Sequence, residues 1–298
     1  MTRRAGALPP WGMAVAAMLS VQLGSALSLP VIATVGPAGT AWLRLSMGAL
    51  VFVALARAPL RQLRRHDLPA LLGLGVTTGL VSIAFLAAIQ RIPLGTAVAI
   101  EFVGPLTVAA LSTRSARALV WPGLALVGVV LLTQPWRGLI NASGVAFALC
   151  AAVGWATYIL LTQRISDRFT GISGLSLTVP VAAVTAAVVG IPQAAGHLSA
   201  SVILAAAGLA ILLPVLPFAL ELLALRKMTP TAFGTLMALE PAIGMLLGLL
   251  LLHQAASAAQ IVGISLVVLA STATQRNGRR RPSTGQAAAA HSELDLIG

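Results

Sequence analysis

Apolar segments of about twenty residues recur along almost the whole chain, separated by short gaps that carry proline, glycine, arginine or aspartate. A helix of about 20 apolar residues is long enough to cross the hydrocarbon core of a bilayer. Only 9% of the residues are charged, whereas about 25% is usual in a soluble domain. Strand-like alternation is missing and a bilayer leaves backbone groups no water to bond, so the segments predict an all-α membrane protein. Ten transmembrane helices are expected, at about residues 12–30, 37–56, 68–89, 94–112, 116–133, 143–163, 172–191, 200–224, 230–252 and 255–273.

The basic residues predict how these helices are oriented. If the N-terminus is cytoplasmic, Arg91 and Arg137 fall on the opposite side and Arg44 lies within the second span. All other basic residues then lie at the termini or in gaps on the cytoplasmic side. Because such residues are concentrated in cytoplasmic loops, both termini are expected there, in a multi-pass protein of a bacterial inner membrane. The net charge of +12 therefore does not indicate nucleic-acid binding.

An internal repeat relates the two halves of the chain. At a shift of 136 residues, residues 88–92 fall on 224–228 and Pro105 falls on Pro241. Each half has five expected spans, and an odd number places the halves in opposite orientations, as in the inverted repeats of secondary transporters. A chance match between segments rich in alanine and leucine is the alternative. The predicted units are a first five-helix repeat at 1–138, a second at 139–275 and a disordered cytoplasmic tail at 276–298.

Four charged residues lie inside expected spans, namely Arg44, Glu101, Glu221 and Glu240. A charge at mid-bilayer costs at least about 2.5–3.5 kcal/mol, so these side chains are expected to face the bundle interior, pair or titrate. Burial favours the neutral form of a carboxyl group, which suits a proton-coupled carrier. In the repeat register, Glu101 lies three residues short of Glu240, nearly one helical turn, so both acids fall on about the same face. The alternative for each acid is a structural ion pair, for instance with Arg44.

Prolines and large polar residues also occur in the expected spans, some of them close to these charged residues. Pro105 follows Glu101 by four residues and Pro241 directly follows Glu240. Each proline removes a helical hydrogen bond and frees a carbonyl group near an acid, although a simple packing kink would look the same. Large polar side chains are harder to bury unpaired than serine or threonine, and they are candidates to line a cavity. These are Gln22, Trp155 and Tyr158.

The sequence lacks the residues on which several other functions depend. The single cysteine, Cys150, permits no intrachain disulfide, and the four histidines show no metal-ligand spacing. The motifs of metalloproteases, serine hydrolases and phosphate-binding loops are also missing. Neither a metal nor a cofactor is expected, and an enzyme is disfavoured.

Five motifs resemble a known family. They are SVQLGSALS (20–28), LGTAVAIEFVGPL (94–106), GWATYIL (154–160), LPFALELLAL (216–225) and FGTLMALEPA (233–242). They are similar to threonine/homoserine exporters of the drug/metabolite transporter superfamily, which are built from two EamA-type halves. The resemblance implies an inner-membrane carrier that expels small amino acids, with protons as the coupling ion. One departure is that the ninth span usually ends in Gly-Glu, where this chain has His253 and Gln254.

The expected function is therefore proton-coupled export of a small neutral amino acid. Glu101 and Glu240 are predicted to approach one midplane cavity from opposite faces, and to carry protons or hold the substrate ammonium group. Arg44 is a candidate for the substrate carboxylate because guanidinium binds carboxylates with two hydrogen bonds. Expected partners are the amino acid, protons and the lipid bilayer, and a second copy of the chain in a homodimer is a further candidate. The alternatives are a carrier of drugs or other metabolites, an intramembrane enzyme and a non-transporting scaffold.

Overall fold

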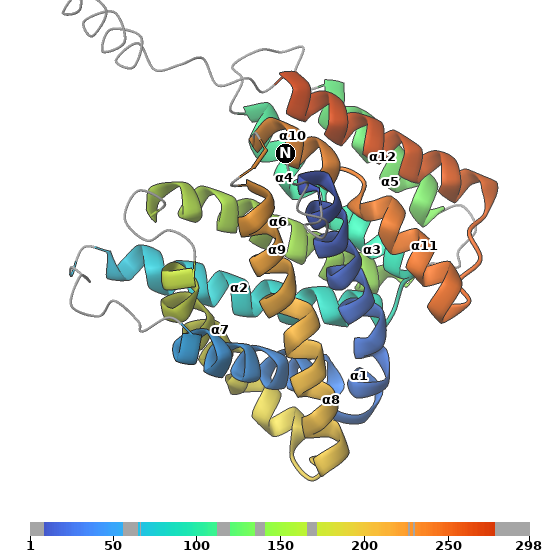
Figure 1. Ribbon diagram of the computed structural model, residues 1–298. Helices are drawn as coiled ribbons and strands as arrows, with labels where there is room; N and C mark the ends of the chain where they lie inside the picture. The colour runs from blue at the N-terminus through green and yellow to red at the C-terminus, as the bar shows by residue number, and fades with distance from the viewer. Residues whose placement is uncertain are drawn as a thin grey trace, which may run out of the picture.

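Helices make up every regular element in the described part of the chain (Figure 1). The computed structural model describes residues 9–55, 65, 67–111, 120–134, 141–165, 172–225, 227–228 and 230–277. Within these residues the all-α prediction is confirmed. The helices are α1 (Pro10–Leu55), α2 (Leu68–Ile89), α3 (Leu94–Glu101), α4 (Val103–Leu111), α5 (Val120–Thr133), α6 (Ala142–Ile165), α7 (Ile172–Ala194), α8 (Ala200–Ala210), α9 (Leu216–Leu225), α10 (Pro230–Met237), α11 (Glu240–Leu252) and α12 (Ala258–Asn277).

Many of these helices have the length and apolar composition of transmembrane helices. Six helical segments of the described residues are long and apolar enough to cross one, and shorter apolar helices lie at Leu94–Ala109, Val120–Thr133 and Ala258–Thr274. Large apolar side chains such as Leu204 and Val188 are exposed, whereas Arg44 and Gln22 are buried. This is the distribution expected in lipid. The molecule is an all-α, multi-pass membrane protein, and the ten spans in two repeats stay a prediction.

The first two expected spans form one helix, α1, with a single interruption. The gap expected at residues 31–36 is helical as far as Val35, and only Gly36 leaves helical geometry, at φ 72° and ψ 169°. The two parts of α1 run in different directions in Figure 1. The Gln193 side-chain oxygen accepts hydrogen bonds from the backbone N–H groups of Ala38 (2.7 Å) and Gly39 (3.1 Å). It thereby satisfies donors that the start of a helix leaves free.

Three expected spans are interrupted in the same way near a proline. Phe102 separates α3 from α4, residues 238–239 separate α10 from α11, and a π-helical turn at Ile211–Val215 separates α8 from α9. Pro105, Pro214 and Pro241 have no N–H to donate to the carbonyl group four residues earlier, which weakens the helix at these positions, although α7 continues through Pro180 and Pro192. The helices therefore break in the interior of the bundle.

α1 and α3 form the centre of the bundle. α1 packs against α2, α7, α8, α9 and α11, and α3 lies between α6 and α11. All eight residues of α3 are buried. α5 and α12 lie side by side at one edge (Figure 1). The predicted tail lies outside the described residues except for its first two, which continue α12.

Candidate functional site

A cavity of about 310 Å³ lies in the interior, between α1, α2, α6, α7 and the interrupted helices. Both halves of the chain supply its walls. The seven residues that the sequence singled out as pathway residues all line it. They are Gln22, Arg44, Glu101, Trp155, Tyr158, Glu221 and Glu240. Of the two prolines, Pro241 is buried beside Glu240, whereas Pro105 lines a second cavity.

The two acids lie at the ends of broken helices. Glu101 is the last residue of α3 and Glu240 the first of α11. Their side chains are 9% and 5% exposed. Breaks at Phe102 and at 238–239 therefore place one carboxyl group from each half at the same cavity. Pro105 and Pro241, which occupy equivalent positions in the repeat register, explain why both helices break there.

A hydrogen bond joins Glu240 to the first half of the chain. Gln22 Nε2 donates to Glu240 Oε1 at 3.0 Å. The other atoms of this pair, Gln22 Oε1 and Glu240 Oε2, are buried without a hydrogen-bond partner. Each has a free acceptor position within the site.

Arg44 contributes the positive charge. It is 3% exposed, and its Nε and Nη1 atoms are buried without a hydrogen-bond partner. No direct ion pair joins Arg44 to Glu101 among the described residues. The alternative of a structural Arg44–Glu101 pair thus finds no contact to support it. A buried donor without a partner costs about 1–3 kcal/mol, so these Arg44 atoms are candidates to bind an anionic group.

The cavity wall carries hydrogen-bond donors and acceptors of both charge types. Arg44 offers two hydrogen-bond donors for an anionic group, whereas Glu240 Oε2 and Gln22 Oε1 are acceptors for an ammonium or hydroxyl group. Glu101 and Glu221 add two further carboxyl groups. An α-amino acid presents both charges that these side chains complement.

Several wall residues were missed from the sequence. Thr78, Val81, Ser82 and Phe85 line the cavity from α2. Their spacing of three and four residues places them on one face of a helix, which is the signal that could have found them. Phe218 of α9, Met237 of α10 and residues of α7 complete the wall. Except for Thr178 of α7, they are apolar like their lipid-facing neighbours, so the sequence offers no comparable signal for them.

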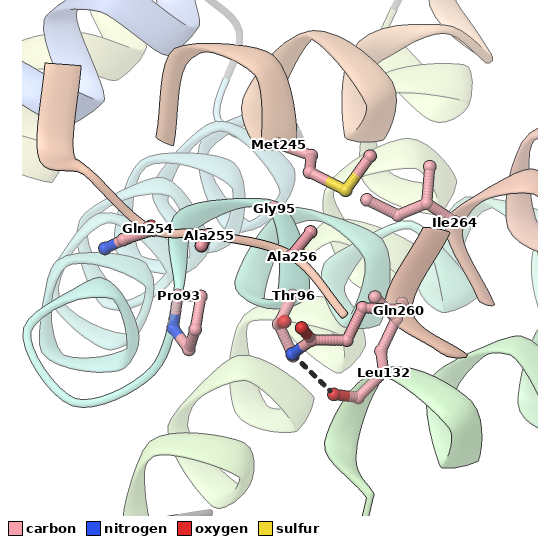
Figure 2. Close-up of a pocket in the computed structure, with 10 residues that line it drawn as sticks. All are labelled: Pro93, Gly95, Thr96, Leu132, Met245, Gln254, Ala255, Ala256, Gln260 and Ile264. Carbon is pink, nitrogen blue, oxygen red and sulfur yellow. Dashed lines mark hydrogen bonds between the residues drawn. The ribbon is translucent and has the colours of Figure 1, made fainter. Parts of the chain in front are cut away.

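The far ends of α3 and α11 meet without a cavity of useful size. Figure 2 shows a pocket of only about 20 Å³ there, near Gln260, whose side chain donates to the Leu132 carbonyl oxygen at 3.3 Å. Such a volume holds about one water molecule. Gln254 accepts a 3.0 Å hydrogen bond from the backbone N–H of Leu94. Its side chain therefore caps the start of α3.

No group of three or more His, Cys, Asp or Glu side chains within the described residues is arranged to hold a metal ion. Cys150 is a free, exposed thiol. The chemistry of the site is thus carried by the guanidinium, carboxyl and amide groups around the main cavity.

Comparison with known proteins identifies the family. Residues 142–274 match the EamA-like transporter family. A threonine/homoserine exporter, RhtA, from Salmonella typhimurium strain LT2 is 34% identical over 278 residues, covering 91% of this chain and 92% of the relative. The chain belongs to the EamA-like transporter family. The RhtA exporter of Escherichia coli strain K12 is 36% identical over 265 residues, covering 86% and 87%. The resemblance found in the sequence motifs is thereby confirmed.

The fold of this EamA-like transporter is also found in a solved protein. One crystal structure superposes with a TM-score of 0.59 at 20% identity, over 90% of this chain and 99% of its own. At this identity the likeness concerns the fold alone. The overall fold of the chain is thus one already seen in a solved structure.

Proposed function

We propose that this EamA-like transporter exports small neutral amino acids, such as threonine and homoserine, in exchange for protons. The observation that carries the proposal is a single cavity in which unpartnered atoms of Arg44, Gln22 and Glu240 complement both charges of an amino acid. Its volume of about 310 Å³ lies at the lower end of the roughly 300–1,000 Å³ found for ligand pockets, as suits a small solute. The RhtA relatives are named for threonine and homoserine.

In this proposal Arg44 binds the substrate carboxylate and Glu240 the ammonium group. The Gln22 hydrogen bond orients the Glu240 carboxyl group, so that Oε2 is directed to the substrate. Glu101 carries the exchanged proton, and Glu240 carries one when the substrate is absent. Two carboxylates at one cavity repel each other, and a proton on either relieves the repulsion. The ammonium group and a proton therefore compete for Glu240, and the charge on Glu240 in turn influences whether Glu101 holds its proton, which is the link that exchange requires.

The proposed membrane arrangement has ten spans in two inverted repeats. The two parts of α1 count as separate spans, and α3–α4, α8–α9 and α10–α11 each count as one interrupted span. The equivalent breaks near Pro105 and Pro241 support the repeat. The chain lies in the inner membrane with both termini cytoplasmic, since basic residues gather on that side. A homodimer stays a prediction.

Thiol labelling tests this topology. Cys150 is replaced by serine, and single cysteines are introduced at the exposed His197 and Lys227. The proposal places His197 outside and Lys227 inside. A membrane-impermeant thiol reagent on intact cells is expected to label His197→Cys and to leave Lys227→Cys unlabelled until the cells are opened. The reverse pattern would refute the proposed orientation.

Transport by the purified protein tests the function itself. Proteoliposomes loaded with unlabelled threonine are expected to take up labelled threonine, and Arg44→Gln is expected to abolish this counterflow. Arg91→Gln is the matched control, because Arg91 lies outside the cavity and stacks on Phe147 at 5.0 Å. Failure of wild-type protein to exchange any member of an amino-acid panel would overturn the proposal. Exchange of unrelated metabolites alone would favour another carrier of the superfamily.

A further inference from the structure

A second cavity, of about 190 Å³, lies next to the main one. It is enclosed by α4, α6, α10 and α12 around the breaks at Phe102 and Ala238. The two cavities have Trp155 and Met237 in common. Only these two side chains are thus shared by both spaces, and the substrate site has a neighbouring space that the proposed function does not use.

The break after α3 directs consecutive residues into different cavities. Glu101 lines the main cavity, whereas Phe102 lines the second. The Phe102 ring packs edge-to-face on Trp155, with centroids 5.1 Å apart and an interplanar angle of 88°. A substrate bound at Arg44 and Glu240 in the main cavity therefore shares the neighbouring side chains Trp155 and Met237 with the second cavity.

The walls of the second cavity are mostly apolar and aromatic. Phe102, Leu106, Ile159 and Phe233 line it, and none of its lining side chains carries a charge. Two hydroxyl side chains of α12 also line it: Thr274 donates to the Ala270 carbonyl oxygen at 2.8 Å, whereas Ser271 is 4% exposed and its hydroxyl oxygen is buried without a hydrogen-bond partner. A buried hydroxyl normally has a partner, so the Ser271 hydroxyl group at the cavity wall awaits a ligand atom.

We propose that the second cavity is a side-chain subsite, through which the transporter also accepts neutral amino acids with long, unbranched, mainly apolar side chains such as methionine. The inference rests on the proposed function, because the amino and carboxyl groups of the substrate stay at Arg44 and Glu240. The side chain passes between Trp155 and Met237. An uncharged lining excludes lysine, arginine, aspartate and glutamate from this subsite.

Methionine matches the residues of the subsite in three ways. Its thioether makes favourable contacts with aromatic rings, and Phe102, Trp155 and Phe233 supply them. Its sulfur is also a weak acceptor for the Ser271 hydroxyl. Its flexible side chain adapts to an irregular space. Norleucine has the same length without the sulfur, so it separates the hydroxyl contact from simple burial.

Counterflow in proteoliposomes tests the subsite with wild-type protein and Ala109→Leu. Ala109 lines only the second of these two cavities, and leucine at this position fills part of it. In Ala109→Leu the half-saturation concentration for methionine is expected to rise about tenfold, the effect of losing room for one methylene group in an apolar pocket. The half-saturation concentration for threonine is expected to change by less than about twofold. The matched control is Ala255→Leu, at the small pocket of Figure 2. It is expected to affect neither substrate.

Ser271→Ala provides an independent measurement that requires no added bulk. Wild-type protein is expected to prefer methionine over norleucine by about threefold, the worth of one modest hydrogen bond, and the variant to lose this preference. Threonine exchange without methionine exchange would overturn the subsite and leave the proposed function intact. If wild-type protein exchanges neither threonine nor methionine, the proposed function is refuted. If Ala109→Leu raises the half-saturation concentrations of the two substrates equally, only the subsite is refuted.

Discussion

Gln22 of α1 donates a 3.0 Å hydrogen bond to Glu240 of α11, across 218 positions of the chain. The contact joins the two predicted repeats at the floor of the cavity and leaves one buried acceptor free on each partner. A carboxyl group held in this way has one orientation, which is what a substrate site requires. The first prediction follows from this pair.

Replacement of Gln22 by leucine is expected to lower threonine exchange by about tenfold or more, because loss of one buried partner leaves the other unpaired. Counterflow at several threonine concentrations measures the change. Gln90→Leu is the control, because Gln90 is exposed at the end of α2. Equal activity of Gln22→Leu and wild-type protein would contradict an orienting role for Gln22.

Arg44→Lys preserves the charge but removes the planar fork of donors. Because only guanidinium binds a carboxylate through two parallel hydrogen bonds, the KM for threonine is expected to rise about tenfold. Arg91→Lys, outside the cavity, should leave KM unchanged. A KM for Arg44→Lys equal to that of wild-type protein would show that Arg44 provides charge alone.

Glu101→Gln and Glu240→Gln test the exchanged proton. Glutamine resembles a permanently protonated glutamate, so Glu101→Gln is expected to retain threonine counterflow but to lose its response to an imposed pH gradient. Wild-type export should become faster as the external solution is acidified, since protons then enter down their gradient. Glu240→Gln is expected to lose counterflow as well, because the ammonium contact is missing. Transport that follows pH in both variants as in wild-type protein would refute the proton role.

The charged and amide side chains at the cavity could be predicted from the sequence, whereas most of its hydroxyl and apolar wall residues could not. Arg44, Gln22 and Glu240 stand out because a polar side chain in an apolar span is costly. Phe218 and Met237 do not stand out, since apolar residues serve equally at a cavity wall, in the core and against lipid. Pairing across the bundle, such as that of Gln22 with Glu240, depends on tertiary packing that periodicity does not describe.

The helix breaks, too, could be predicted only in part from the sequence. Prolines 105 and 241 marked where a helix would be disturbed, but the extent of each interruption depends on packing around it. The expected gap between the first two spans is a clearer case. Residues 31–35 carry no helix-breaking pattern strong enough to end α1, and Gly36 alone changes its direction. A sequence rule that ends one span at Pro30 and begins the next at Pro37 therefore predicts a gap over residues 31–36, where the structure departs from helical geometry only at Gly36.

Gly36 leads to a prediction on stability. Its φ of 72° is strained for any other residue, and a Cβ atom there would collide with the Gln193 side chain, which accepts the hydrogen bonds from Ala38 and Gly39. Gly36→Ala should therefore disturb both the backbone and the Gln193 contacts. The melting temperature in detergent is expected to fall by roughly 3–8 °C, from about 1–3 kcal/mol of strain.

Gly196→Ala is the matched control for this collision. Gly196 has a similar φ of 79°, but a Cβ atom there would meet nothing within 4 Å. Both variants place a Cβ atom at a positive φ, and only Gly36→Ala also displaces Gln193. Gly36→Ala should consequently melt at a lower temperature than Gly196→Ala, and Gln193→Ala should reproduce part of the difference. Equal melting temperatures of the two glycine variants would show that the Gln193 contact does not stabilise the bend in α1.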